Sequence, residues 1–354
     1  MAITSLDNFG HASGSISMSE LRDYYGKSGS VSLGLNLSGT DTAVPSHLPL
    51  YTQTLSFSDY RSMPRILKKK GTTETVSSSG TWTPNQLNCV QYNVYVVGGG
   101  GSGGGHSTTS GREKVASGGG AGGTAFRRYS VQDHNITNAN VTIGAGGAGV
   151  SYTNGTGTVI SGRNGGTTTF NPGGSGATIS ATGGSRGFGG RQGAIDATVT
   201  STLPVGEASS STTISDWGIC PASLGGSGSG GEINYTGGKG PGLSLGSNHS
   251  GATGGGSPNL DSIFGGEDGS TAGGTGYAKG ATTSAPTKPS EWDSDVSDTF
   301  QGGAAVQHSS GSAGASDAGT NYGAGSGGSA SEVGAGSTGN GSSGAIFITY
   351  YEIN

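Results

Sequence analysis

Two runs of β-branched and aromatic residues bracket a long stretch in which hydrophobic and polar positions follow no regular period. The first run, residues 92–97 (YNVYVV), leads directly into four glycines, and the second, residues 345–351 (AIFITYY), follows Gly344. Residues of these types are enriched in β-strands. We therefore predict two strands that pair with each other and close the glycine-rich stretch between them at its base.

Shorter apolar runs between the glycine clusters predict further strands. Asn-Gly pairs at Asn154, Asn164 and Asn340 are typical of tight turns. The pattern indicates a mainly β and irregular fold, with a glycine-rich domain of short β-strands over residues 82–354. The predicted short strands are residues 141–143, 158–160, 167–170 and 177–179.

Glycine accounts for 76 of the 354 residues, about three times its usual share of ~7%. Only 30% of the chain is apolar, so a core of ordinary size cannot be built. Such compositions are often disordered. However, only 11% of the residues are charged, aromatic residues are spread through the body, and a strand-forming run ends it. We therefore expect an ordered structure that depends little on apolar burial.

Three structures could account for the glycines. A phosphate-binding Gly-x-x-x-x-Gly-Lys-Ser/Thr motif is absent, and the Gly-x-Gly-x-x-Gly matches open no predicted helix. Collagen needs glycine at every third position, a register that residues 323–334 break. Polyglycine II helices remain, with three residues per turn and hydrogen bonds only to neighbouring chains. Glycine lets such helices approach on several sides because it has no Cβ.

Residues 1–70 differ in composition and contain only 6 of the glycines. An internal repeat relates residues 16–22 (ISMSELR) to residues 55–61 (LSFSDYR). In each copy, the alternating start suits a short strand, and the second Ser followed by an acid suits a helix N-terminus. We predict a small N-terminal α+β attachment module, whose apolar residues either dock on another subunit or fill its own core. The docking candidates are Leu21, Arg22, Tyr24, Tyr25, Phe57, Tyr60 and Arg61.

A basic run, residues 64–70 (PRILKKK), and a Thr/Ser-rich stretch, residues 71–81, follow this module. We predict a solvated linker at 71–81, and the alternative for the basic run is a contact with an acidic partner surface. The run lacks the interleaved aromatics of a nucleic-acid site. With a net charge of −5, the chain gives no reason to expect nucleic acid as a partner.

Motifs in both parts of the chain resemble those of tailed-phage proteins. Residues 17–26 (SMSELRDYYG) and 55–61 are similar to N-terminal segments of phage virion structural proteins, although Ser62 replaces the glycine of the commonest form. In the body, the ordered set VVGGGG (96–101), VTIGAGGAG (141–149) and GAIFITY (344–350) resembles the glycine-rich domain of phage tail fibres. It is also similar to the receptor-binding adhesins at the fibre tips of T-even-type phages.

The resemblance implies a layered sandwich of polyglycine II helices with variable loops between the glycine runs. It implies a place in the tail of a virion assembled in the host cytoplasm, with residues 1–70 docked on other virion tail proteins. The loops would contact a host cell-surface receptor, a protein or a polysaccharide, and a homo-oligomer is expected, with a trimer favoured. The alternatives are a purely structural tail or capsid fibre or decoration protein without receptor binding, and a bundle that binds a flat surface such as ice or a polysaccharide.

By the same resemblance, aromatic residues in the insertions between glycine runs are the candidates for receptor contacts, because exposed aromatics are good binding anchors. The largest insertions are residues 195–224 and 281–300. The other interpretation is that these side chains fill gaps at the edges of the glycine layers. The candidates are Phe188, Trp217, Tyr235, Phe264, Tyr277, Trp292, Phe300 and Tyr322.

The sequence contains no convincing pattern for catalysis or metal binding, so we expect no enzyme activity, metal or cofactor. The six histidines are scattered, and the acidic residues of 291–298 lack the glycine and terminal glutamate of a calcium loop. Cys89 and Cys220 are interpreted as free thiols, with a disulfide as the alternative. No apolar run approaches the ~20 residues of a membrane span, and no signal-peptide pattern is present.

Overall fold

The computed structural model describes residues 67–353 with internal gaps, and near the N-terminus it describes two short paired strands, β1 (Ile3–Thr4) and β2 (Ser15–Ile16). The described part is mainly β-strand and irregular structure, as predicted, with one short helix among its residues, α3 (Val131–His134). The gaps are residues 87, 108–113, 135, 154–157, 192–193, 196–217, 221–222, 241–242, 246–249, 254, 259–270, 273–291, 294–295, 297–299, 301, 309–315 and 332–334. All seven predicted docking residues, Leu21, Arg22, Tyr24, Tyr25, Phe57, Tyr60 and Arg61, lie outside the described residues.

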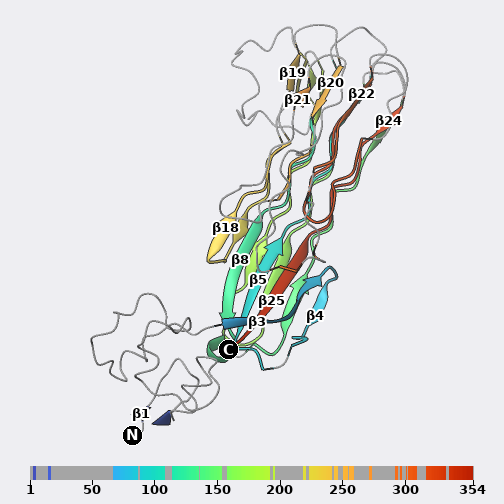
Figure 1. The fold of residues 1–354 in the computed structure, drawn as a ribbon. Helices are drawn as coiled ribbons and strands as arrows, with labels where there is room; N and C mark the ends of the chain where they lie inside the picture. Colours follow the sequence, from blue (N-terminus) through green and yellow to red (C-terminus); the bar gives the residue numbers. More distant parts are fainter. Residues whose placement is uncertain are drawn as a thin grey trace, which may run out of the picture.

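A five-stranded sheet, here called the base sheet, forms the end of the molecule at which the C-terminus lies (Figure 1). The predicted pairing of the two bracketing runs is confirmed, because the strands that contain them are antiparallel neighbours, with Val96 opposite Ile346. The strand order is β18 (Ile233–Tyr235), β8 (Thr124–Ser130), β5 (Gln91–Val97), β25 (Ala345–Ile353) and β3 (Leu67–Val76).

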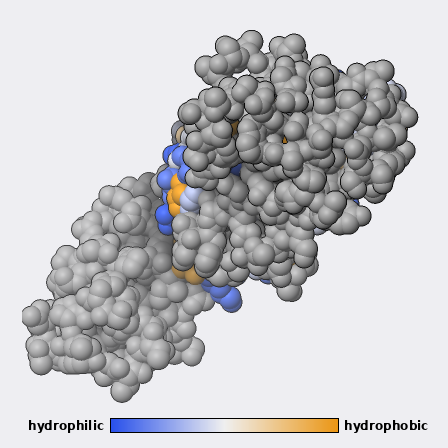
Figure 2. Space-filling model, turned by 90° about the horizontal axis from the view of Figure 1, so that it is seen from above, coloured by the Kyte–Doolittle hydropathy of each residue, from blue (hydrophilic) through white to orange (hydrophobic). Residues whose placement is uncertain are grey.

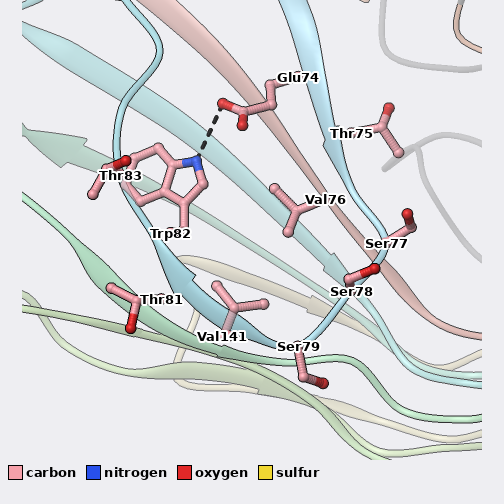
Figure 3. Close-up of a pocket in the computed structure, with 11 residues that line it drawn as sticks. Glu74, Thr75, Val76, Ser77, Ser78, Ser79, Thr81, Trp82, Thr83 and Val141 are labelled. Atoms are coloured by element: carbon pink, nitrogen blue, oxygen red, sulfur yellow. Dashed lines mark hydrogen bonds between the residues drawn. The ribbon is translucent and has the colours of Figure 1, made fainter.

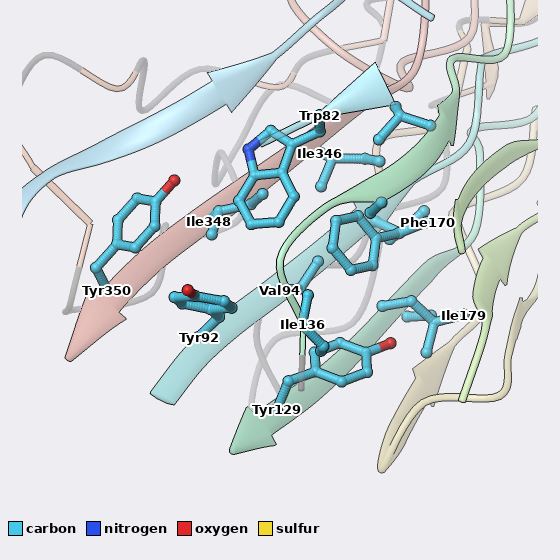
Figure 4. Packing of buried hydrophobic residues seen from close by; sticks show 14 of the residues in the cluster. Trp82, Tyr92, Val94, Tyr129, Ile136, Phe170, Ile179, Ile346, Ile348 and Tyr350 are labelled. Atoms are coloured by element: carbon cyan, nitrogen blue, oxygen red, sulfur yellow. The ribbon is translucent and has the colours of Figure 1, made fainter. Parts of the chain in front are cut away.

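The central strands of the base sheet are buried on both faces. In β5, Tyr92, Val94 and Val96 contribute to one hydrophobic cluster, while Tyr95 and Val97 contribute to a second. β25 alternates in the same way, as the two-residue period of a strand requires. The base sheet is therefore a middle layer with core on each side, and Figure 4 shows the first cluster.

A second five-stranded sheet supplies the other side of the first cluster, contributing Trp82, Phe170 and Ile179 (Figure 4). Three of the predicted short strands lie in this sheet with shifted ends, and the fourth, 158–160, is a strand elsewhere in the body. The strand order is β17 (Gly228–Ser229), β13 (Ile179–Ala181), β12 (Thr168–Pro172), β9 (Ala139–Thr142) and β4 (Gly80–Trp82).

Residues 71–81 are not a linker in the structure. β3 continues to Val76 and pairs with β25, and β4 begins at Gly80, so only a short connection separates two strands. The preceding lysines also belong to β3, and Lys70 Nζ lies 2.8 Å from Glu352 Oε2 on the neighbouring strand. The threonines that suggested a linker suit an edge strand, because β-branched residues favour strands even where they are exposed.

Beyond the base sheet, extended glycine segments run side by side along the body (Figure 1). The backbone N–H groups of Gly98, Gly101 and Gly104 donate in turn to the carbonyls of Gly123, Gly120 and Ser117. The intervening N–H groups of Gly99 and Ser102 instead donate to a different segment, at 166 and 163. Successive donors thus rotate among neighbours with a period of three, the hydrogen-bonding pattern of polyglycine II.

Segment 98–104 occupies the centre of this lattice. It exchanges backbone hydrogen bonds with six other segments, at 117–123, 144–149, 162–166, 182–187, 323–329 and 339–344. A Cβ on Gly100 would lie 2.0 Å from the carbonyl oxygen of Ala324, and one on Gly101 would lie 2.1 Å from that of Ser185. Backbone carbonyls cannot move away as flexible side chains can, so glycine is required here for close approach.

The predicted turns at Asn164 and Asn340 are wrong. Both residues lie in extended segments, and neither has the positive φ that a tight Asn-Gly turn requires. Their amide oxygens instead accept N–H groups of neighbouring segments: Asn164 Oδ1 from Arg186 at 2.9 Å and Asn340 Oδ1 from Gly149 at 2.7 Å. Asn154 lies outside the described residues.

Small sheets complete the body at the end opposite the base sheet, which we call the far end (Figure 1). One has the order β11 (Thr158–Ile160), β6 (Gly105–Ser107), β23 (Ser329–Ser331) and β22 (Val306–His308). Another has the order β15 (Ala194–Ile195), β14 (Gly189–Arg191), β7 (Lys114–Ala116), β20 (Ser250–Thr253) and β21 (Thr271–Ala272). Two further pairs are β10 (Ser151–Tyr152) with β24 (Gly336–Ser337), and β16 (Gly218–Cys220) with β19 (Leu243–Leu245).

Candidate functional site

The far end collects strands that are joined by the longest connecting segments of the body. Residues 196–217 connect β15 to β16, residues 273–305 connect β21 to β22, and residues 309–328 connect β22 to β23. Most of the insertion expected at 195–224 therefore lies between two far-end strands, β15 and β16. Residues 196–217, 273–291 and 309–315 of these segments lie outside the described residues, as do three predicted contact residues, Trp217, Phe264 and Tyr277.

Two of the predicted receptor contacts are instead part of the core at the base. Trp292 is 5% exposed and Phe300 is fully buried, both in the second hydrophobic cluster against the base sheet. The ring centroid of Trp292 lies 4.2 Å from that of Phe347 and 5.2 Å from that of Tyr95. The prediction is wrong for these two residues because the second face of the base sheet is apolar and needs covering.

The remaining described candidates are half-buried. Tyr322 packs edge-on against Phe347, with ring centroids 5.7 Å apart, so it also extends the core. Phe188 lies under the guanidinium of Arg186, which is 5.7 Å from its ring centroid. Tyr235 lies in β18, where it pairs with Thr124. The alternative interpretation, that aromatics fill the edges of the layers, fits Tyr322, Trp292 and Phe300 best.

A pocket of about 500 Å³ opens between the edge strands β3 and β4 (Figure 3). Its walls are the edges of the two packed sheets, since β3 ends the base sheet and β4 ends the second sheet. The lining is mostly hydroxyl-bearing, with one carboxylate, one indole and two valines. The lining residues are Glu74, Thr75, Val76, Ser77, Ser78, Ser79, Gly80, Thr81, Trp82, Thr83 and Val141.

Two donors fix the carboxylate of Glu74 in this pocket. The indole Nε1 of Trp82 donates to Glu74 Oε2 at 3.1 Å (Figure 3), and the hydroxyl of Tyr350 donates to the same oxygen. Burial and then the hydrogen bond to Glu74 raise the pKa of Tyr350, so its hydroxyl remains a donor at neutral pH. Trp82 is itself held by Tyr92 and Phe170, whose ring centroids lie 5.8 and 5.4 Å away (Figure 4).

A second cluster of charges fastens the 292–300 segment to the edge of the base sheet. Asp293 Oδ1 lies 2.7 Å from Lys69 Nζ, and Asp293 Oδ2 accepts the backbone N–H of Thr73. The hydrogen bond from Lys69, followed by that from Thr73, lowers the pKa of Asp293. Asp293 is therefore a structural ion-pair partner of the base sheet.

Viewed from above, the few described residues that are visible include both hydrophilic and hydrophobic ones (Figure 2). Among the described residues, two large hydrophobic side chains, Leu224 and Ile233, are exposed. Within the same part of the chain, no three His, Cys, Asp or Glu residues come together as a metal site. The described helix is also too short to cross a membrane.

The sequence did not predict the pocket or the contacts of Asp293 with Lys69 and Thr73, which we call the Asp293 clamp. The signals were present: Trp82 interrupts a polar stretch, and Glu74 occurs among threonines. These signals could be interpreted only once residues 67–82 were known to form two edge strands, because that arrangement brings Glu74 and Trp82 within hydrogen-bonding distance. Asp293 could not be paired with Lys69 without knowing that its neighbour Trp292 lies on the base sheet.

A family described as a glycine-rich domain matches residues 73–351, which span both the base sheet and the glycine lattice. The search of curated proteins found no match.

Proposed function

This chain belongs to the glycine-rich domain family, and we propose that it serves as a non-enzymatic tail-fibre or tip adhesin of a tailed-phage virion. Its N-terminal residues would dock on other virion tail proteins. Segments at the far end would contact a host cell-surface receptor, a protein or a polysaccharide. Phage fibres are usually symmetric oligomers and often trimers, so a homotrimer is the favoured assembly.

The observation that supports this proposal is that the two ends of the glycine lattice differ. Strand β3, which follows the predicted attachment module, lies in the base sheet together with the C-terminal strand β25. The longest connecting segments attach to strands at the opposite end. Binding residues are commonly carried on loops that a rigid scaffold positions. A lattice of interlocked backbones would hold such loops away from the virion without needing a large apolar core.

The alternative is a purely structural fibre or decoration protein without a receptor. The burial of Trp292 and Phe300 favours this alternative, because two of the aromatics expected to bind a receptor belong to the core instead. The main remaining candidates for receptor contact are residues 196–217, which connect two far-end strands, and residues 273–291, which connect the far-end strand β21 to Trp292 at the base.

Cell adsorption of the full, labelled chain against a panel of bacterial strains tests the proposal. We expect saturable binding to some strains, and we expect it to be lost when residues 196–217 or 273–291 are replaced by Gly/Ser segments of equal length. The replacements stop before Trp292 so that the core stays intact, and thermal unfolding of each variant checks the fold. Absence of binding by the folded oligomer would favour the purely structural role, whereas binding unaffected by both replacements would show that neither segment carries the receptor contact.

A further inference from the structure

We propose that the pocket between β3 and β4 binds the ammonium group of a small organic amine through the carboxylate of Glu74. The volume of the pocket, about 500 Å³, falls within the roughly 300–1,000 Å³ typical of small-ligand sites. The pocket lies at the base of the molecule, so this proposal does not depend on the adhesin function proposed for the far end.

Strand alternation decides which side chains of β3 and β4 face the inside of the pocket. Successive side chains of a strand point to opposite faces of its sheet, and both Val76 and Trp82 pack against the first cluster, between the two sheets. Glu74 shares the inner face of β3 with Val76, and its carboxylate meets the Trp82 indole there (Figure 3). Thr75 and Thr81 face the other way. The strands therefore turn one carboxylate and several apolar groups toward the pocket.

Gly80 leaves the space that a ligand would occupy. It pairs with Val141 across the second sheet, so a side chain at position 80 would share the face of the Val141 side chain, which belongs to the first cluster. A Cβ built on Gly80 would meet no atom within 4 Å. Glu74 therefore lies beside an open space with an apolar border rather than beside close-packed protein.

The hydrogen-bond partners of Glu74 leave its negative charge uncompensated. Trp82 and Tyr350 both donate to the same carboxylate oxygen, Oε2, and both are neutral donors. Burial raises the pKa of Tyr350, so its hydroxyl keeps its proton at neutral pH. Within the part of the chain that the structure describes, no hydrogen bond reaches the other oxygen, Oε1, and no cation pairs with Glu74.

The two lysines nearest to Glu74 in sequence are engaged with other carboxylates. Lys70 Nζ lies 2.8 Å from Glu352 Oε2, and Lys69 Nζ lies 2.7 Å from Asp293 Oδ1. Covering a charge costs free energy unless the charge is paired, so a ligand that covers Glu74 must itself supply a cation. An ammonium group has three N–H donors, and its hydrogen bond to Oε1 would be charge-assisted and therefore strong.

The lining argues against other ligand classes. It contains no lysine, arginine or histidine to bind a phosphate or another anion. A single carboxylate supplies too few oxygens for Ca²⁺, which needs about six to eight ligands. An uncharged apolar ligand would cover the carboxylate without compensating its charge. A short carbon chain that ends in an ammonium group meets both requirements, because the chain can lie on Val76 and Val141 while the charge pairs with Glu74.

The test uses the full chain and compares three amines with one neutral molecule. The amines are n-butylammonium, Nα-acetyl-lysine methylamide and the methyl glycoside of glucosamine, and the neutral molecule is n-butanol. Saturation-transfer NMR detects binding, and titration gives the Kd of each probe. The affinities of the three amines distinguish a simple alkylamine, a lysine side chain and an amino sugar as the source of the ammonium group.

Two variants test the pocket, and one serves as the matched control. Glu74→Gln removes the charge but keeps an oxygen that can accept from Trp82 and Tyr350. Val76→Phe keeps the charge and places a larger side chain in the space beside Gly80. Glu232→Gln makes the same change at an exposed carboxylate that does not line the pocket. Thermal unfolding checks the fold of each variant.

We expect at least one of the amines to bind and n-butanol not to bind. The Kd of that amine should rise about tenfold or more in Glu74→Gln, as for loss of a hydrogen bond to a charged group. It should also rise in Val76→Phe and stay unchanged in Glu232→Gln. Absence of binding by all three amines would overturn the proposal, as would equal binding of n-butanol and n-butylammonium or equal affinity of wild type and folded Glu74→Gln. If Glu74→Gln does not fold, an unchanged Kd in Val76→Phe would overturn it.

Discussion

Asp293 accepts the backbone N–H of Thr73, a residue 220 positions earlier in the chain. Thr73 lies in β3, whose outer side would otherwise present an unpaired N–H at the edge of the base sheet. Exposed edges invite pairing with other chains, and here an acidic side chain occupies one of the free donors. The neighbouring Trp292 is buried against the same sheet. Asp293 therefore contacts the edge of the base sheet, while Trp292 packs on its face.

Replacing Asp293 with Asn should lower the free energy of unfolding at pH 7 by about 1 kcal/mol, because an ion pair and a charge-assisted hydrogen bond are lost. The folded-state pKa of Asp293 is lowered. Its contribution is therefore present above the unfolded value of about 3.9 and is lost as pH falls through the folded value. Chemical denaturation of wild type and variant from pH 7 to pH 2 measures this.

Glu232→Gln is the matched control, since Glu232 likewise pairs with a cation and accepts a backbone N–H, both of Arg128, but the Arg128 side chain is 58% exposed. We expect it to change stability by less than about 0.5 kcal/mol. A difference between Asp293→Asn and wild type that stayed constant down to pH 2 would contradict the assignment of the clamp.

Tyr92→Phe should make the protein more resistant to alkaline unfolding. Burial raises the pKa of Tyr92 to about 12, whereas an exposed tyrosine titrates near 10. Between these values the unfolded chain ionises and the folded chain does not, so the contribution of Tyr92 to stability falls as pH rises. By pH 12 the variant should have lost about 2 kcal/mol less than wild type. Equal losses in denaturant titrations at pH 9 and pH 12 would contradict this burial.

Gly100→Ala tests the lattice directly. The new Cβ would lie 2.0 Å from the carbonyl oxygen of Ala324, so two backbones must separate at a cost of about 3 kcal/mol or more. Gly173→Ala is the control, because its Cβ would meet the side-chain oxygen of Asn138 at 2.9 Å, which can rotate away, and its nearest backbone contact would be the Asn138 carbonyl oxygen at 3.2 Å. Calorimetric unfolding should show a clearly lower Tm for the first variant only, and similar Tm values would argue against close backbone packing.

Trp292→Ala should lower the free energy of unfolding by about 3–5 kcal/mol, as truncation of a buried large aromatic does. Trp292→Phe should recover most of this loss by filling part of the space against Phe347. If Trp292 were a receptor contact, both variants would keep wild-type stability and lose cell adsorption. Thermal unfolding alongside the adsorption assay distinguishes these outcomes.

Much of this architecture follows from local chemistry in the sequence. The pairing of 92–97 with 345–351 was predictable because both runs are strand formers at the borders of the glycine region. The need for glycine in the body follows from the absence of a Cβ at close backbone contacts. These predictions required only residue type and position relative to the glycine runs.

The assignments that failed depended on tertiary contacts between distant residues. Trp292 and Phe300 lie in an insertion that is polar overall, so nothing nearby indicates that they cover Phe347. Residues 71–76 have the composition of a linker, and only the exposed edge of β25 makes them a strand. Asn164 has the right neighbour for a turn, but the lattice uses its amide oxygen to satisfy the N–H of Arg186.

The central position of segment 98–104 has a consequence for biosynthesis. The backbone N–H of Gly100 donates to the carbonyl of Ser342, so this segment meets a required partner only after about 240 further residues have been made. Contacts between residues so distant in sequence slow folding, because the entropy cost of closing a long loop comes before any stabilising contact forms. The glycine body would therefore emerge from the ribosome without its final hydrogen bonds and fold only once β25 has been made. Chains truncated before Ala345, the first residue of β25, would not reach the native state.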